Sequence, residues 1–303
     1  MSQPVPEAAI SEVPHANAEP GILADLLDLT KARLNLLVLI TTFVGFWMGA
    51  PGAIDWVRLI EAMIGTALCA ASAAAFNQIW EVKVDVLMPR TAQRPVAAGR
   101  MKKNVALMIA GALGVAGTAL LWFAVNSLSA ILAVSTIVVY VLLYTPLKRR
   151  SAWCTLVGAV SGAIPPVVGW AAANTNLSLG AWVLFGVLFA WQMPHFLAIA
   201  WMYKDQYRSA GLVMLKRDDE TGVATAVTSF VFTLLLTFTT MVQFNAGLAG
   251  SIYLGGALVI NSLFAMAAAH FVVDRSRPVA RRLFFASIMY LPLILGLMVF
   301  TKQ

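Results

Sequence analysis

Charged residues are scarce in this chain: they make up 12% of its 303 residues, whereas 60% are hydrophobic. Soluble domains carry about twice that share of charge, so the composition excludes a soluble protein and indicates an integral membrane protein. Cysteine is scarcer still, because the chain holds only Cys69 and Cys154. Both lie in apolar stretches without CxxC spacing, so we expect two buried free thiols.

Long apolar runs are what the chain has in abundance. A helix needs roughly 20 apolar residues to cross about 30 Å of hydrocarbon. Nine runs of about this length occur, at residues 34–50, 57–79, 105–125, 128–147, 152–173, 180–203, 223–244, 247–273 and 283–300. The sequence therefore predicts an all-α, polytopic membrane protein with nine transmembrane helices.

The net charge of +7 would suit a nucleic-acid-binding protein, but the positions of the basic residues indicate a membrane topology instead. All but Arg58 and Lys302 of the 21 basic residues lie before the first run or in the connections after the second, fourth, sixth and eighth runs. The positive-inside rule then predicts a cytoplasmic N-terminus and a periplasmic C-terminus. We expect membrane lipid, and no nucleic acid, around this protein.

The N-terminal residues have a different composition from the rest. Residues 1–24 contain four prolines, several acids and no Lys or Arg, which predicts a disordered tail. Residues 25–303 then form a single transmembrane domain. The tail has neither the basic start of a signal peptide nor the arginines of a mitochondrial presequence, so we expect a bacterial inner membrane.

Prolines interrupt three of the predicted helices, at Pro165-Pro166, Pro194 and Pro292. Each proline removes or disturbs a backbone hydrogen bond, which hydrocarbon tolerates only where protein or a wet cavity compensates. The long polar connections, residues 80–104 and 204–222, lie on the predicted cytoplasmic side. We therefore expect a central cavity that opens to the cytoplasm.

Three polar residues recur at intervals of four where the second apolar run ends: Asn77, Glu81 and Asp85. At about 3.6 residues per helical turn, this spacing places them on one stripe. Mg²⁺ prefers oxygen ligands and commonly binds through one or two carboxylates together with substrate phosphates. The stripe predicts a metal site, although solvated residues on an emerging helix would have the same spacing.

Arg90 and Arg94 follow the stripe closely, and guanidinium groups bind phosphate oxygens bidentately. From Asn77 to Pro95 the sequence reads N-x₃-E-x₃-D-x₂-M-P-R-T-x₂-R-P. This pattern resembles the first signature of the intramembrane UbiA-type prenyltransferase superfamily. More narrowly, it resembles the protoheme IX farnesyltransferases, which are also called heme O synthases.

Other segments extend the resemblance over about residues 24 to 300. The segment L-T-K-A-R-L at 29–34 resembles the family's L-T-K-P-R-L, with Ala32 in place of proline, and Y-T-P-L-K-R at 144–149 resembles its middle block. The strip W-Q-M-P-H-F at 191–196 resembles the heme branch. Relatives outside that branch usually carry a second D-x₃-D motif, whereas Asp205 is followed four residues later by Ser209.

The resemblance implies transfer of the farnesyl group of farnesyl diphosphate to the 2-vinyl group of protoheme IX (heme B), which gives heme O. It implies Mg²⁺ held by the catalytic Asn77, Glu81 and Asp85, with the further catalytic residues Asp205 and Tyr207 at the cytoplasmic edge. The implied diphosphate ligands are Arg90, Arg94, Lys148, Arg149 and Lys204. A lone His195 would most often be a core residue, but the resemblance implies contact with the porphyrin. A downstream heme A synthase or terminal oxidase would be the protein partner.

Two other functions fit parts of the sequence. A sibling prenyltransferase acting on an aromatic quinone precursor or a chlorophyll-like acceptor would share the diphosphate site. Only the W-Q-M-P-H-F strip and the missing second D-x₃-D motif argue against it.

A secondary transporter needs ionisable residues near the bilayer midplane with access from both sides. The outer half is almost bare, since Asp55, Arg58 and Glu61 cluster at the outer end of the second span and no acidic residue lines the other spans, which favours an enzyme.

Overall fold

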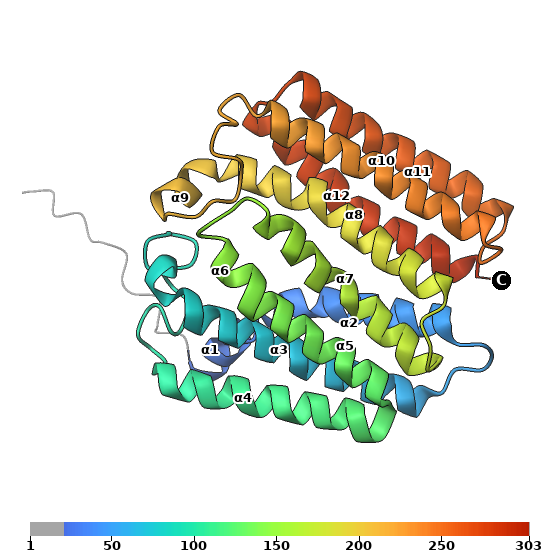
Figure 1. Ribbon diagram of the computed structural model, residues 1–303, viewed down its shortest axis with the longest axis horizontal. Helices are drawn as coiled ribbons and strands as arrows, with labels where there is room; N and C mark the ends of the chain where they lie inside the picture. The colour runs from blue at the N-terminus through green and yellow to red at the C-terminus, as the bar shows by residue number, and fades with distance from the viewer. Residues whose placement is uncertain (1–20, 303) are drawn as a thin grey trace, which may run out of the picture.

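The computed structural model describes residues 21–302, and this part of the chain consists of helices and their connections (Figure 1). Nine helices within it are long and apolar enough to cross a membrane, which confirms the predicted all-α, nine-span fold. They are α2 (Ala32–Gly49), α3 (Trp56–Asp85), α4 (Lys103–Leu120) with a π-helical end (Leu121–Val125), α5 (Ser127–Val138) continued by a π-helical turn (Val139–Tyr144) and α6 (Thr145–Leu147), α7 (Cys154–Ala173), α8 (Leu179–Met202), α10 (Val223–Asn245), α11 (Ser251–Val273) and α12 (Arg277–Phe300).

Two short helices lie outside these spans: α1 (Ile22–Leu29) and α9 (Lys204–Ser209). The predicted N-terminal tail overlaps α1, because the last three of its 24 residues belong to that helix. Residues 1–20 of the predicted tail lie outside the described residues.

The second span differs most from its prediction. The apolar run ends near residue 79 because Glu81, Lys83 and Asp85 lower its hydropathy, yet α3 continues to Asp85. Its start is capped by Asp55, whose carboxylate accepts a hydrogen bond from the Arg58 amide at 3.0 Å. The additional turns keep the polar stripe helical, so its side chains turn toward the neighbouring helices.

Helices α7 and α8 form the interior of the bundle. The apolar windows of these two helices are 72% and 67% buried, against 22% for the span that starts with α4. α7 packs against α2 and α5, and α8 packs against α10 and α12.

Glycine permits the close crossing of α2 and α7. A Cβ atom on Gly45 would lie 1.9 Å from the carbonyl oxygen of Pro166, and a Cβ atom on Gly169 would lie 1.9 Å from the carbonyl oxygen of Thr42. Small residues let transmembrane backbones approach in this way.

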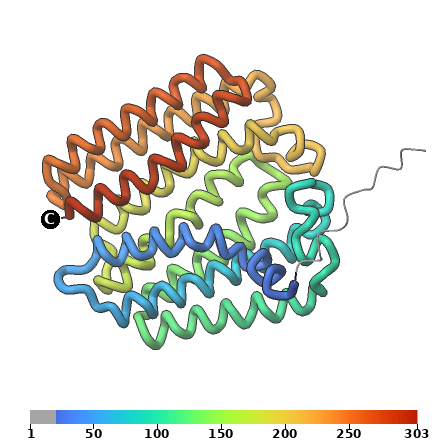
Figure 2. Tube along the Cα trace, turned by 180° about the vertical axis from the view of Figure 1, so that it is seen from behind, coloured from blue at the N-terminus to red at the C-terminus, as the bar shows by residue number. Residues whose placement is uncertain are grey.

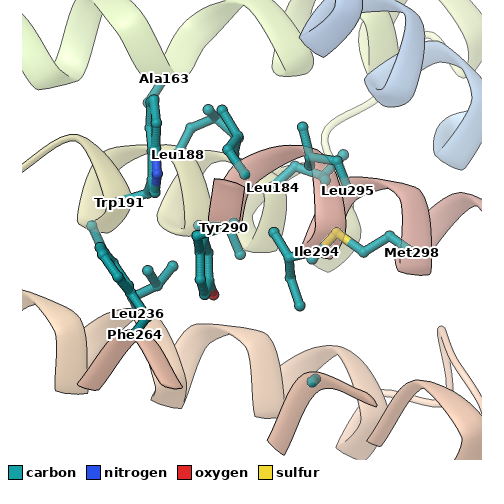
Figure 3. Close-up of a cluster of buried hydrophobic side chains, with 14 of the residues drawn as sticks. Ala163, Leu184, Leu188, Trp191, Leu236, Phe264, Tyr290, Ile294, Leu295 and Met298 are labelled. Carbon is teal, nitrogen blue, oxygen red and sulfur yellow. The ribbon is translucent and has the colours of Figure 1, made fainter. Parts of the chain in front are cut away.

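A cluster of apolar side chains fills the half of the bundle built from α8, α10, α11 and α12 (Figure 3). Trp191 and Leu188 of α8 face Tyr290 and Ile294 of α12 across it (Figure 3). One polar pair lies inside, since the Tyr290 hydroxyl donates to the amide oxygen of Asn261 at 2.7 Å, whereas the buried indole nitrogen of Trp170 has no partner among the described residues. This half of the bundle is therefore mostly apolar.

The two long polar connections share one end of the bundle. Figures 1 and 2 both show α9 and the connection between α3 and α4 at the end opposite the C-terminus. The last turn of α3, which carries Asp85, leads into that connection. The polar stripe and the segment after α8 thus come together at this end.

Candidate functional site

The oxygen-bearing side chains of the α3 stripe are buried together. Asn77, Glu81 and Asp85 are 1%, 8% and 1% exposed. The amide nitrogen of Asn77 donates to a Glu81 carboxylate oxygen at 2.9 Å. Burial of two carboxylates in a membrane protein is costly unless cations offset their charge, so the partners of these residues define the site.

Each of the three side chains has its own cation. The Lys31 ammonium donates to the amide oxygen of Asn77 at 2.9 Å. The Lys148 ammonium lies 2.9 and 3.1 Å from the two oxygens of Glu81. One guanidinium nitrogen of Arg94 lies 2.7 and 2.8 Å from the two oxygens of Asp85. Three cations against two carboxylates leave one positive charge over, so the cluster can accept an anion.

Lys148 follows the fourth span directly and is buried. Burial by itself lowers the pKa of this ammonium, but Tyr144 and Glu81 outweigh burial and hold the pKa above its usual range. The Tyr144 ring also lies beneath the ammonium, 4.4 Å from centroid to nitrogen, a distance that favours a cation. Lys148 therefore keeps its charge.

A π-helical turn, Val139–Tyr144, lines the cluster from the side opposite α3. Such turns often mark functional sites, because the extra residue per turn reorients neighbouring side chains. The following residue, Thr145, accepts a hydrogen bond from the Asn77 amide at 3.2 Å and donates one to the Tyr140 carbonyl at 2.8 Å. Asn77 is thus held in one orientation by both α3 and the π-helical turn.

Lys31 belongs to this charged cluster, although it is not among the predicted site residues. It links α1 to α2 in a left-handed conformation, with φ of 49°, which non-glycine residues seldom adopt outside functional or tight turns. Its ammonium also lies 3.4 Å from the Tyr140 hydroxyl. The signal that pointed to it was its place in the L-T-K-A-R-L segment.

The other predicted diphosphate ligands make no hydrogen bond or ion pair with the three stripe residues in the described part of the chain. Arg90 donates to the Tyr207 hydroxyl at 3.1 Å and lies over the Tyr203 ring. Lys204 lies over the Trp201 ring, 3.9 Å from its centroid. Arg149 is exposed, and within the described residues its side chain makes no hydrogen bond or ion pair.

The two remaining predicted catalytic residues differ in position. Tyr207 is buried, and its hydroxyl contacts Arg90, so it joins the arginine to the segment after α8. Asp205 is exposed on α9 and forms an ion pair with Arg277 at the start of α12. Asp205 therefore ties α9 to the last span, outside the charged cluster.

His195 lies in a separate, aromatic part of the bundle between α8 and α12. Its ring is 5.0 Å from the ring centroids of both Trp191 and Phe284. Its Nδ1 lies 2.8 Å from the Ser287 hydroxyl, and that hydroxyl donates to the Phe284 carbonyl at 2.5 Å. Because the single serine hydrogen is used in this way, the serine oxygen accepts from His195 Nδ1–H.

The Nε2 atom of His195 is left with a lone pair. Within the described residues this atom makes no hydrogen bond, and it is not among the buried polar atoms without a partner, so it is accessible. No carboxylate of these residues pairs with the ring, and apolar surroundings disfavour a charged imidazole. A neutral ring held at Nδ1 offers Nε2 to an iron atom or to a hydrogen-bond donor.

A metal ion would find suitable ligands in the α3 stripe. Asn77, Glu81 and Asp85 offer hard oxygen atoms of the kind that Mg²⁺ prefers. Within residues 21–302 no three His, Cys, Asp or Glu side chains come together. A metal at the stripe would therefore complete its coordination with oxygens of a bound anion, which is how Mg²⁺ is usually held beside phosphates.

Comparison with known proteins relates this geometry to a family. Residues 38–291 match the UbiA prenyltransferase family. The protoheme IX farnesyltransferase of Solibacter usitatus is 41% identical over 289 residues, which cover 92% of this chain and 99% of that protein.

Solved structures of low sequence identity share the fold. A structure of digeranylgeranylglyceryl phosphate synthase superimposes with a TM-score of 0.79 at 16% identity, covering 92% of this chain and 98% of that chain. A UbiA homolog from Archaeoglobus fulgidus bound to DMAPP and Mg²⁺ gives a TM-score of 0.65 at 14% identity, covering 90% and 99%. The resemblance seen in the sequence is confirmed: the chain belongs to the UbiA prenyltransferase family.

Proposed function

We propose that this chain transfers the farnesyl group of farnesyl diphosphate to the 2-vinyl group of protoheme IX. The observation that carries the proposal is the buried α3 stripe, in which each oxygen-bearing side chain has its own cation. The relative from Solibacter usitatus, named for this reaction, supports the choice of substrates.

The charged cluster promotes departure of the diphosphate. A divalent cation held by Asn77, Glu81 and Asp85 would neutralise charge that develops on the leaving oxygens. Lys31, Lys148 and Arg94 lie within hydrogen-bond distance of those three residues, so their donors would lie next to an anion bound at such a cation. Fixed donors aimed at developing charge are the strongest single contribution to most such reactions. The Mg²⁺ in the homolog from Archaeoglobus fulgidus supports this assignment.

The bonds exchanged follow from these roles. The bond between farnesyl C1 and the diphosphate oxygen breaks, and the terminal carbon of the vinyl group forms a new bond to C1. Water adds to the remaining vinyl carbon and loses a proton, which gives the hydroxyethylfarnesyl group of heme O. The surrounding apolar helices keep bulk water from the allylic cation until the vinyl group has reacted.

His195 contacts the porphyrin in this proposal. Its Nε2 is accessible and carries the lone pair, because Ser287 holds Nδ1–H. Trp191 and Phe284 cover the faces of the imidazole, and this aromatic surface suits a flat macrocycle. The histidine thus distinguishes a heme acceptor from an aromatic acid, for which no imidazole ligand is needed.

The bundle end that carries α9 and the connection between α3 and α4 faces the cytoplasm in this proposal (Figure 1). Nearly all basic residues lie in the connections of that end, which supports the orientation. A bacterial inner membrane, with the C-terminus in the periplasm, is the corresponding location. Heme O would then pass to a heme A synthase or a terminal oxidase.

Expression of the full chain in a bacterial host that lacks heme O tests the function. Hemes extracted from the membranes and analysed by mass spectrometry should include heme O. Membranes that contain abundant protein but convert only 4-hydroxybenzoate or another aromatic acceptor would overturn the heme assignment and favour the sibling prenyltransferase.

A further inference from the structure

A second basic site lies beside the charged cluster, at the same end of the bundle. A pocket of about 230 Å³ is formed by the end of α8, by α9 and by the segment 211–217 that follows α9. Its apolar lining includes Ala200 and Leu215, whereas the charged part of its lining consists of Lys204, Arg208, Lys216 and Arg217. Pockets that enclose a whole small molecule measure about 300–1,000 Å³, so this one accommodates one edge of a larger ligand.

The four basic residues of the pocket are available to an anion. None of the four ion pairs among the described residues involves them. The pocket lining contains no Asp or Glu, and the nearby carboxylate of Asp205 is paired with Arg277. Several like charges around one pocket repel one another unless an anionic group lies between them.

The local backbone explains how this pocket forms. Gly211 ends α9 with φ of +72°, a left-handed conformation that glycine adopts without strain. The amides of Gly211 and Leu212 bond to the carbonyls of Arg208 and Tyr207 at 3.0 and 2.8 Å, which is the Schellman arrangement. The chain therefore folds back along α9 and brings Lys216 and Arg217 toward Arg208.

The wall of the pocket is shared with the charged cluster. The Val213 amide donates to the Lys148 carbonyl at 2.6 Å, and the side chain of the same lysine binds Glu81. Tyr207 lines the pocket and accepts the hydrogen bond from Arg90. A ligand anchored in the pocket thus lies next to the diphosphate cations, on the other side of the 207–213 segment.

We infer that this pocket binds the propionate carboxylates of the protoheme acceptor, an inference that rests on the proposed function. Carboxylates are costly at membrane depth, so the propionates belong at this end while the apolar macrocycle extends between the helices. A diphosphate is the weaker choice of occupant, because the pocket offers no carboxylate to share a metal ion with it. Lysine and arginine bind carboxylates without a metal.

The double variant Arg208→Gln/Lys216→Gln tests the inference in purified full-length protein. Three occupants are possible: the propionates, a diphosphate and a lipid headgroup. Steady-state kinetics with protoheme IX, with its dimethyl ester and with farnesyl diphosphate, in vesicles with and without phosphatidylglycerol, distinguish them. For the unmodified protein, we expect esterification to raise the acceptor KM about tenfold, since charge-assisted hydrogen bonds are lost. The double variant should show this higher KM with free protoheme, no further effect of esterification, and an unchanged KM for farnesyl diphosphate.

The control Lys103→Gln/Arg282→Gln removes the same charge from two exposed positions on the same side, away from the pocket, and should retain the kinetics of the unmodified protein. A raised KM for farnesyl diphosphate alone would assign the pocket to the diphosphate and overturn the inference. Activity that depends on phosphatidylglycerol in the vesicles, lost in the double variant without any ester effect, would overturn it in favour of a lipid headgroup. An ester effect of equal size in the double variant would also contradict it.

Failure of the unmodified protein to convert protoheme at all would instead overturn the proposed function, and the ligand assignment with it.

Discussion

The region around α3 and α6 differs in charge from the region between α8 and α12. Around α3 and α6, two buried carboxylates and an amide are each paired with a cation. Between α8 and α12, one neutral histidine is enclosed by aromatic rings and has no ion pair among the described residues. The first region suits a highly charged leaving group and the second suits a flat apolar acceptor. If the proposed function is right, the comparison implies that separate helices bind the donor and the acceptor, so mutations should affect the two substrates separately.

Removal of one stripe carboxylate should have the largest effect. In Asp85→Ala, the proposed metal site would lose a ligand and Arg94 loses its partner, so conversion of heme B to heme O should fall by about 10³-fold or more. The measurement is heme O in extracted membranes, normalised to the amount of inserted protein. Asp28→Ala, which removes an exposed carboxylate of α1, is the control and should remain active. Retained activity in Asp85→Ala would remove the metal assignment.

The Lys148–Glu81 pair allows stability and catalysis to be separated. Lys148→Met leaves a buried carboxylate without its cation, which should destabilise the protein by roughly 3–5 kcal/mol and reduce turnover by about 10²-fold. The double variant Glu81→Gln/Lys148→Met removes both charges of this pair, so neither partner is left unpaired; its thermal unfolding in detergent should return toward that of the unmodified protein while turnover stays low.

The two measurements have a clear alternative outcome. If the double variant regained turnover together with stability, the pair would be structural, and the diphosphate would be held by other cations. The charged pairs around α3 would then stabilise the bundle without taking part in the reaction, and the two halves would differ only in how their side chains pack.

On the aromatic side, His195→Ala should impair the acceptor alone. Loss of the imidazole should raise the KM for protoheme about tenfold or more, since a ligand of the iron or a hydrogen-bond acceptor is removed, and leave the KM for farnesyl diphosphate unchanged. His270→Ala, at an exposed position near the end of α11, is the matched histidine control. An equal change in both KM values would show that His195 supports the whole bundle.

The sequence predicts the number of spans and the stripe on α3 because hydropathy and helical periodicity are local properties. It ends the second span too early, since hydropathy treats Glu81 and Asp85 as solvated, whereas cations neutralise them. Arg94 is visible in the local pattern, nine residues after Asp85, but the other two cations are not: Lys31 and Asn77 are 46 residues apart, and Glu81 and Lys148 are 67 apart. The backbone turn at Gly211 that builds the basic pocket depends on one residue with φ of +72°, which no periodicity reveals.

The smallest expected effect concerns Ser287, which we expect to act only through its hydrogen bond with His195. Ser287→Ala removes the hydroxyl that accepts from Nδ1–H, but it keeps the backbone carbonyl that accepts from the Trp191 indole at 2.8 Å. The contact between α8 and α12 should therefore persist while the imidazole becomes free to carry its proton on Nε2. We expect the KM for protoheme to rise about three- to tenfold, with unchanged kcat and an altered absorption spectrum of the bound heme. Ser229→Ala removes another buried serine hydroxyl, one that donates within its own helix at 2.8 Å, and should alter neither quantity. An unaltered heme spectrum in Ser287→Ala would mean that Ser287 does not determine which nitrogen of His195 faces the acceptor.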